Sequence, residues 1–67
     1  MKNIERIMYS SRSSFNEVGK NGVEKIYFHS AMYEGDKSFC TVYFEDGAEL
    51  QIFDIDEIFW RSSNENH

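Results

Sequence analysis

The chain has one cysteine, Cys40, and one internal histidine, His29, and these are the residue types that form a thiol nucleophile and its general base. Such catalysis requires the two side chains within hydrogen-bond reach and a third group that orients the histidine. The alternation of the two predicted strands does not clearly place both on one face, and no local signature surrounds Cys40. We therefore expect a packed cysteine, a surface histidine and no enzymatic activity.

Three carboxylates, those of Asp54, Asp56 and Glu57, form a cluster of a kind that can bind calcium or cleave a glycosidic bond. A calcium loop needs a longer series of ligands with a glycine at its bend, which this segment lacks. Glycosidic chemistry needs a substrate cleft that 67 residues can hardly form. We expect these carboxylates to cap a turn or to be solvated, and we expect neither a metal nor a cofactor.

The aromatic residues exceed what a small core can hold: six Phe, four Tyr and one Trp. Some of them must stay on the surface, where aromatic clusters commonly mark binding sites. Stacking of single-stranded nucleic acid is one use of such a cluster, but it normally comes with basic flanks, whereas the flanks here are acidic. Binding of a protein partner through an aromatic sheet face, or of a second copy to give a homodimer, fits better.

The net charge of −5 is unevenly distributed along the chain. Five basic and three acidic residues occur through Tyr33, and two basic and nine acidic residues follow from Glu34 onward. The acidic half repels phosphate backbones, so it disfavours direct nucleic-acid binding and favours a basic partner. An alternative function is therefore a small acidic inhibitor, phage-like in size and charge, that mimics nucleic acid and blocks a basic site on a host defence or nucleic-acid-processing protein.

These two hypotheses together define the predicted partner-binding residues. They are Tyr27, Tyr33, Tyr43, Glu45, Asp46, Glu49, Asp54, Asp56, Glu57 and Trp60.

The residues around Asp46-Gly47 predict a β-hairpin at the centre of the domain. The dipeptide favours a type I′ turn, which needs positive φ at both central residues. Its strands are predicted over residues 38–45 and 48–53, with Leu50 and Ile52 facing inward.

Residues 23–33 predict one long strand, with a bend near Ser30-Ala31 because eleven residues exceed the usual strand length. Ile26, Phe28 and Met32 are predicted on one face. Tyr27, His29, Ala31 and Tyr33 are predicted on the other.

The remaining segments are more ambiguous. Residues 3–15 fit a helix capped by Asn3 or a short strand through Ile4–Tyr9, and we favour a strand or an irregular arm. Residues 16–22 predict a loop, and its Gly-Lys-Asn-Gly sequence has neither the spacing nor the ending of a phosphate-binding loop. Residues 54–61 fit one helical turn or a final strand over 58–61.

The whole pattern predicts a mostly β fold, in one domain over residues 1–61 with a flexible polar tail over 62–67. Three tightly connected strands make an antiparallel meander, and the two end segments must cover it. The result is either a small curled barrel of SH3-like or Sm-like size or a meander capped by one short helix. With one thiol and no apolar run long enough for a membrane, we expect a cytoplasmic protein that does not span one.

Overall fold

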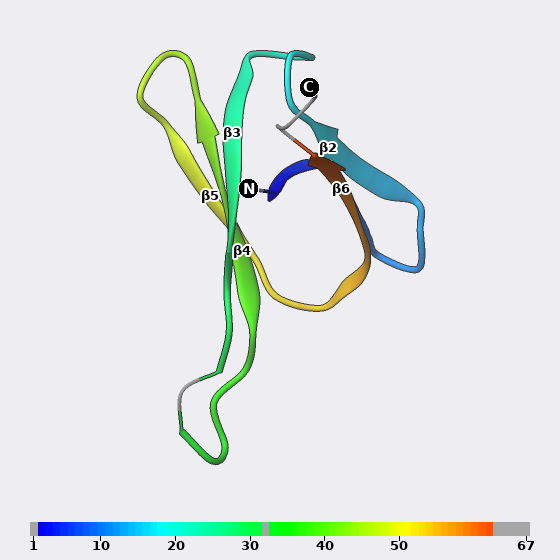
Figure 1. Ribbon diagram of the computed structural model, residues 1–67, viewed down its shortest axis with the longest axis vertical. Coiled ribbons are helices and arrows are strands. Elements are labelled where there is room, and N and C mark those ends of the chain that lie inside the picture. The colour runs from blue at the N-terminus through cyan, green and yellow to red at the C-terminus, as the bar shows by residue number, and fades with distance from the viewer. Residues whose placement is uncertain (1, 32, 63–67) are drawn as a thin grey trace.

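The computed structural model describes residues 2–31 and 33–62, and all regular structure in this part of the chain is β. Six strands form two antiparallel sheets of three strands each (Figure 1). The strands are β1 (Lys2–Tyr9), β2 (Ser14–Glu17), β3 (Val23–His29), β4 (Phe39–Phe44), β5 (Glu49–Ile52) and β6 (Ile55–Ser62). The mostly β prediction is confirmed.

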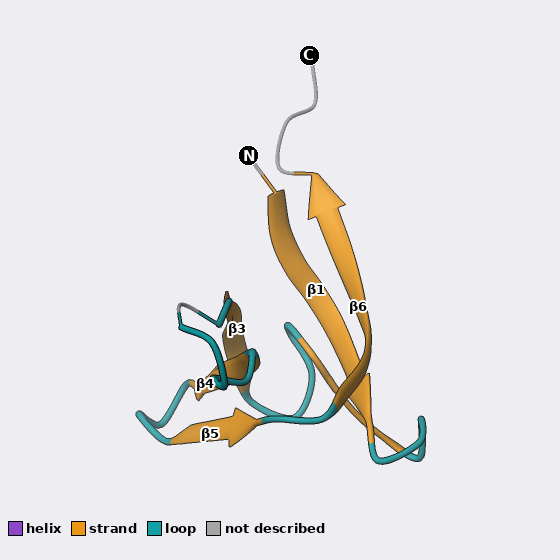
Figure 2. Ribbon diagram, turned by 90° about the horizontal axis from the view of Figure 1, so that it is seen from below, coloured by secondary structure: helices purple, strands orange, loops and turns teal. Residues whose placement is uncertain are grey.

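Sheet B, in the order β3-β4-β5, is the predicted meander. Sheet A, in the order β2-β1-β6, pairs the first and last strands of the fold along their length. The two end segments therefore cover the meander by forming a second sheet of their own. The sheets diverge from one another and do not close (Figure 2), so the prediction of a small barrel is wrong.

The end segments contain no helix within the described residues, so the helical alternatives are also wrong. Ile55 and Ile58 have helical spacing, but isoleucine and the neighbouring aromatic residues favour strands. Ile58 is also paired with Ile7 across the β1–β6 ladder. This tertiary pairing extends the final strand over Ile55–Ser62. The described residues contain no helix that is long and apolar enough to cross a membrane.

The hairpin between β4 and β5 is confirmed, but its turn is not type I′. Gly47 has a φ of 93°, whereas Asp46 is not among the residues with positive φ. The N–H of Gly47 donates to the carbonyl of Phe44 at 3.0 Å, and the N–H of Phe44 donates to the carbonyl of Ala48 at 2.9 Å. This is a three-residue loop in which a turn of type I geometry is followed by a left-handed glycine.

The long strand ends at His29 and not at Tyr33, so the predicted length is wrong. The irregularity lies between Val23 and Lys25, at the start of β3, and not near Ser30-Ala31. Beyond the strand, the N–H of Ala31 donates to the hydroxyl of Ser38 at 3.3 Å across the β3–β4 loop. The face predicted for Met32 lies outside the described residues.

The predicted loop over residues 16–22 is partly strand, because β2 extends through Glu17. β2 pairs with β1, and the N–H of Val18 extends this pairing by donating to the carbonyl of Glu5 at 2.9 Å. Gly19, Asn21 and Gly22 have positive φ, as their types indicate. Because β2 has only four residues and little apolar alternation, its pairing with β1 decides its conformation.

The core lies between the sheets. Its buried residues are Ile4 and Ile7 from β1, Val23 and Ile26 from β3, and Cys40 and Val42 from β4. Sheet A packs over sheet B mainly through β1 against β3, which leaves the edge strand β5 less covered. Leu50 and Ile52 face inward as predicted, because they pair with the buried Val42 and Cys40. Leu50 is nevertheless 42% exposed, while Ile52 is half-buried against the core.

Candidate functional site

The candidate functional surface is the outer face of sheet B, which is turned away from sheet A. Strand alternation and register place three rows of side chains on this face. The rows are Lys25, Tyr43 and Glu49; Tyr27, Thr41 and Gln51; and His29 and Phe39, extended by a ring contact to Phe53. We call the five ring-bearing residues, Tyr27, His29, Phe39, Tyr43 and Phe53, the aromatic face.

Three rings of the aromatic face stack side by side across the strands. The centroids of His29 and Phe39 are 4.6 Å apart with an interplanar angle of 17°, and those of Phe39 and Phe53 are 5.0 Å apart at 27°. Because Phe39 is on the central strand, its ring is covered by a neighbour from each side. The stack therefore presents ring edges outward, whereas nucleic-acid bases stack on open ring faces.

The other two rings of the aromatic face lie around a lysine. Tyr27 and Tyr43 meet edge to face, with centroids 5.8 Å apart at 82°. The ammonium nitrogen of Lys25 is 5.2 Å from each ring centroid. Contacts of this kind contribute about 0.5–1 kcal/mol at exposed sites. Within residues 2–31 and 33–62, no ion pair involves Lys25, so its closest charge contacts are with the two ring faces.

Cys40 and His29 lie on opposite faces of sheet B. His29 is paired with Phe39, the residue before Cys40, and its Nε2 is 3.1 Å from the hydroxyl of Thr41 on the outer face. Cys40 points into the core, where burial raises the pKa of its thiol to about 11. A thiol with this pKa is protonated at neutral pH, so the two residues do not form a nucleophile and its base.

The structure separates the predicted aromatic site residues into three places. Tyr27 and Tyr43 belong to the aromatic face. Trp60 is on the inner side of sheet A, where it borders a groove together with Tyr27. Tyr33 is 73% exposed in the β3–β4 loop, which projects from the rest of the fold (Figure 1). Tyr27 therefore borders both the aromatic face and the groove, and Tyr33 is apart from both.

The predicted acidic residues form two groups at opposite ends of β5. The first group, Glu45, Asp46 and Glu49, surrounds the β4–β5 turn and is exposed. The second group is Asp54, Asp56 and Glu57. β5 has four residues, which span about 13 Å at 3.3 Å per residue.

The second acidic group is partly occupied by contacts within the chain. The carboxylate of Asp56 accepts a hydrogen bond from the backbone N–H of Arg12 at 2.9 Å, and Glu57 forms an ion pair with the Arg12 guanidinium at 3.2 Å. Asp56 and Glu57 thus hold the β1–β2 loop. Asp54 has no such contact within the described part of the chain and borders a hollow beside Phe53.

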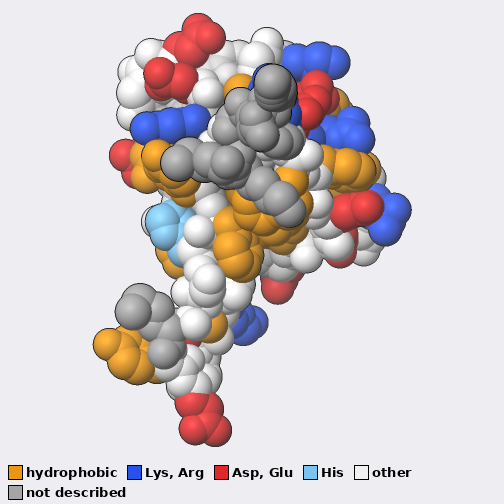
Figure 3. Space-filling view, viewed as in Figure 1, with side chains coloured by type: hydrophobic (Ala, Val, Ile, Leu, Met, Phe, Trp, Pro, Cys, Tyr) orange, Lys and Arg blue, Asp and Glu red, His pale blue; other side chains and the backbone are white. Residues whose placement is uncertain are grey.

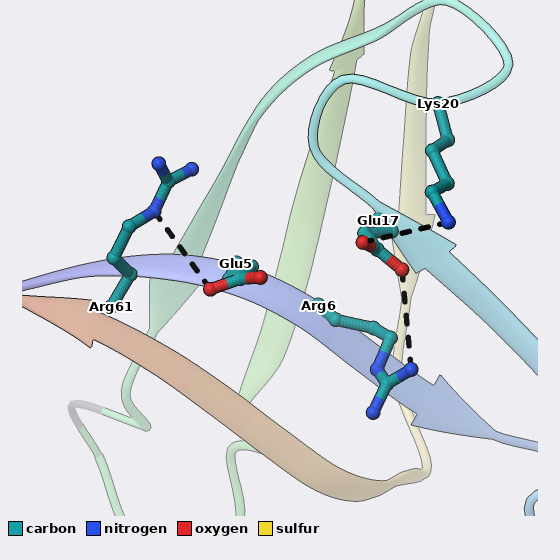
Figure 4. Close-up of polar contacts among 5 residues, drawn as sticks. All are labelled: Glu5, Arg6, Glu17, Lys20 and Arg61. Carbon is teal, nitrogen blue, oxygen red and sulfur yellow. Dashed lines mark ion pairs between the residues drawn. The ribbon is translucent and has the colours of Figure 1, made fainter.

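The outer face of sheet A is charged, in contrast to the aromatic face. The carboxylate oxygens of Glu17 are 3.9 Å from side-chain nitrogens of Arg6 and Lys20 (Figure 4). The guanidinium of Arg61 is 3.8 Å from the carboxylate of Glu5. The guanidinium of Arg6 also covers the ring of Phe59 at 4.4 Å. Exposed pairs of this length contribute little to stability, but they make the surface polar.

Sequence reasoning did not include Phe39, Phe53 and His29 among the site residues. The signal was present, because strand alternation places His29 with Tyr27, Phe39 with Tyr43, and Phe53 with Glu49. The sequence does not give the register of the three strands, and only the register shows that these sets share one face.

The described residues contain no group of three side chains suited to hold a metal ion. Comparison of the chain with protein-family models, curated proteins and solved structures gave no significant match. Any function assigned to the chain therefore rests on the geometry of its surfaces.

Proposed function

We propose that this chain is a non-enzymatic interaction module that binds a protein partner, or a second copy of itself, through the aromatic face. The observation that carries the proposal is the presence of five rings, in a stack of three and a contacting pair, on a sheet face that nothing in the described chain covers. Tyr27 and Phe53 remain 52% and 45% exposed there. Aromatic side chains in contact with one another supply much of the binding free energy at protein interfaces.

The composition of the aromatic face favours a protein over a nucleic acid. Its only basic side chain is Lys25, and Glu49 lies in the same row. The edge-on stack of His29, Phe39 and Phe53 offers apolar area for packing, which a protein surface can match in shape. The acidic-inhibitor alternative has less support, because the carboxylates are divided between two groups and one group is engaged by Arg12.

Affinity capture tests the proposal directly. The bait proteins are the wild type, the double variant Tyr43→Ser/Phe53→Ser, and the matched control Phe15→Ser, which removes a 49% exposed ring from sheet A. We expect the wild type and Phe15→Ser to capture the same partner from a lysate of the producing cells, identified by mass spectrometry. The double variant should lose it about tenfold or more, because central aromatic residues are typical hot spots. Circular dichroism checks that each variant folds.

The salt dependence of capture separates the proposed function from its alternatives. An apolar interface should retain its partner at high salt, whereas an acidic surface should lose a basic partner steeply. Equal capture by the double variant, combined with loss in Glu45→Gln/Glu49→Gln, would establish the acidic-inhibitor function instead. Binding of an oligonucleotide at ordinary salt would refute both. Sedimentation of the wild type at two concentrations measures self-association.

A further inference from the structure

A second surface lies between the two sheets where they diverge. A hollow of about 190 Å³ is bordered by Asn3, Ile4, Ile26, Tyr27, Phe28 and Trp60. A second hollow of about 260 Å³ shares four of these residues and extends to Val18, Glu24, Lys25 and Arg61. The two hollows adjoin through these shared residues, and we call them together the inter-sheet groove. Hydrophobic side chains are gathered between the sheets in this view of the molecule (Figure 3).

The apolar residues of the inter-sheet groove are only partly covered. Trp60 is 49% exposed and Phe28 is 39% exposed, although strand alternation turns both toward the space between the sheets. At their base, Ile4 and Ile26 are each 5% exposed and belong to the core. The groove is therefore an outward continuation of the core, and apolar groups placed in it would be removed from water.

One wall of the groove is the free edge of β3, because β3 is the outermost strand of sheet B. In β4, the Phe44 N–H donates to the Ala48 carbonyl, so the even-numbered residues of β4 bond to β5 and the odd-numbered residues bond to β3. The odd-numbered residues of β4 are paired with odd-numbered residues of β3. The backbone groups of Ile26 and Phe28 are consequently directed away from β4, to the edge that borders the groove.

The charge at the rim of the groove differs from that of the chain. Lys25 and Arg61 are at the rim with one acidic residue, Glu24, while the chain as a whole carries a net charge of −5. Lys25 takes part in no ion pair among residues 2–31 and 33–62, and the Arg61 contact to Glu5 is long, at 3.8 Å. The positive charge of the rim is therefore complementary to carboxylates, whereas the two ends of β5 are acidic.

We propose that the inter-sheet groove binds an extended segment of a partner protein, with alternating apolar and acidic residues, that adds as a strand to the free edge of β3. The backbone of Ile26 and Phe28 pairs with the segment, its apolar side chains pack against Trp60 and Phe28, and its carboxylates face Lys25 and Arg61. Extended peptides are recognised in this way where an exposed sheet edge adjoins side-chain pockets. The inference goes beyond the proposed function, because the groove and the edge of β3 form a second site, which meets the aromatic face at Tyr27, and because the ligand is an extended segment.

Two synthetic peptide pools test the inference. Both contain peptides of about six residues, the usual strand length, that alternate Val, Ile and Tyr with a charged residue, which is Glu in one pool and Lys in the other. Amide hydrogen exchange of the intact chain is measured with each pool at about 1 mM, the weak end of specific binding. We expect the Glu pool to slow exchange at Ile26 and Phe28 about tenfold or more, and the Lys pool to leave it unchanged.

Backbone and side-chain variants sharpen this test. Chemical synthesis can replace the N–H of Phe28 by an ester oxygen, which removes an edge donor and keeps the side chain. The same change at Gln51 removes an outward donor from β5, the opposite edge of the sheet, and is the matched control. We expect binding of the Glu pool to weaken about fivefold or more with the Phe28 ester and with Trp60→Ser, and to be unchanged with the Gln51 ester.

Several outcomes would overturn the inference. One is that neither pool protects Ile26 and Phe28, and another is that protection appears at the edge of β5 instead. Protection that increases with protein concentration in the absence of peptide would identify a second copy of the chain as the occupant. The variant Tyr43→Ser/Phe53→Ser separates the two proposals, because it should lose the captured partner and still bind the Glu pool. Retention of the captured partner by this variant would count against the proposed function alone, and loss of Glu-pool binding would count against a separate site in the groove.

Discussion

Cys40 is the residue whose surroundings most restrict its chemistry. Its side chain is fully buried between the sheets, next to Val42 on the same strand face. Burial disfavours the charged thiolate, which raises the pKa of the thiol from 9.0 to about 11. The same burial keeps reagents away from the sulfur. Cys40 therefore acts as a small apolar core residue, as the sequence predicted.

The raised pKa of Cys40 predicts a loss of stability in alkaline solution. Below pH 9 the thiol is protonated in both the folded and the unfolded chain, so the free energy of unfolding does not depend on it. Between pH 9 and about 11 only the unfolded chain releases the proton, and the free energy of unfolding should fall by on the order of 2 kcal/mol. Urea unfolding across this range measures the decrease.

The variant Cys40→Ala is the control for this measurement, because tyrosines and lysines titrate in the same range. Its baseline stability will be lower, but the difference between its pH profile and that of the wild type isolates the thiol. Parallel profiles for the two proteins would contradict the prediction.

At the scale of the elements, the β4–β5 turn shows how one residue fixes a strand register. Gly47 has a φ of 93°, a conformation that L-residues adopt with strain, and no atom lies within 4 Å of the Cβ that a substitution would add. The cost of a side chain at Gly47 is therefore conformational and not steric. The carboxylate of Asp46 supports the loop by accepting a hydrogen bond from the N–H of Ala48 at 2.9 Å.

Replacement of Gly47 by the two mirror forms of alanine tests this explanation. We expect L-alanine to lower the free energy of unfolding by about 1–2 kcal/mol, the cost of a left-handed L-residue. D-alanine favours positive φ and restricts the unfolded chain, so it should be neutral or stabilise by up to about 1 kcal/mol. Thermal unfolding of synthetic proteins gives both values, and equal destabilisation by both forms would show that space at the turn, and not φ, is limiting.

The β1–β2 loop is the most strained connection in the described chain. Ser10, Ser11 and Arg12 have φ values of 54°, 54° and 69°, three consecutive left-handed residues without a glycine. The hydroxyl of Ser13 donates to the carbonyl of Ser10 at 2.6 Å, and Asp56 accepts from the N–H of Arg12. Contacts from β6 thus offset the strain of a loop that joins β1 and β2.

This role of Asp56 distinguishes it from its neighbour Asp54. We expect Asp56→Ala to lower the free energy of unfolding by about 1–2 kcal/mol, because a hydrogen bond to a charged group is lost from a strained loop. Asp54→Ala should change it by less than about 0.5 kcal/mol, as is usual for exposed positions. Urea unfolding compares the two, and equal effects would show that the Arg12 contact does not hold the loop.

The sequence predicted sheet B better than sheet A, and the reason is the range of the interactions. The β4–β5 hairpin is specified by a local turn, and the side chains before it, such as Tyr43 and Phe44, point to opposite faces of the sheet in turn. Sheet A depends on the pairing of Ile7 with Ile58, which are far apart in the sequence. The helical spacing of residues 55, 58 and 59 carries no information about this partner, so the local pattern left the conformation open.

In the candidate site too, the local features were predictable from the sequence and the long-range contacts were not. Alternation places Tyr27 in one set with His29 and Tyr43 in one set with Phe39, because that rule is local, but it does not show which set faces outward. The proximity of Trp60 to Tyr27 arises from the packing of two sheets and has no counterpart in any local pattern. The Arg12 contacts that occupy Asp56 and Glu57 are of the same long-range kind.

At the scale of the whole molecule, the distribution of charge affects stability as well as binding. The chain has a net charge of −5, and its ion pairs are exposed and weak. We expect repulsion among the carboxylates from Glu34 onward to outweigh the attraction within these pairs. Repulsion of this kind disfavours the compact state and is screened by salt.

We therefore expect added sodium chloride to raise the urea midpoint of unfolding, and not to lower it. The variant Glu45→Gln/Glu49→Gln removes two charges next to the β4–β5 turn and should show a smaller salt effect. A midpoint that falls with salt would indicate that ion pairs such as that of Arg12 and Glu57 dominate the electrostatics of the fold.

The pairing of β1 with β6 also determines when each sheet can form during synthesis on a ribosome. β3, β4 and β5 follow one another along the chain, so sheet B can assemble as soon as they emerge. β1 emerges first and can pair with β2, but its other edge stays unpaired until β6 has emerged. At about 5–20 residues per second, the delay is on the order of seconds. During that time the edge of β1 that later pairs with β6 is an open strand edge, which can pair with another chain.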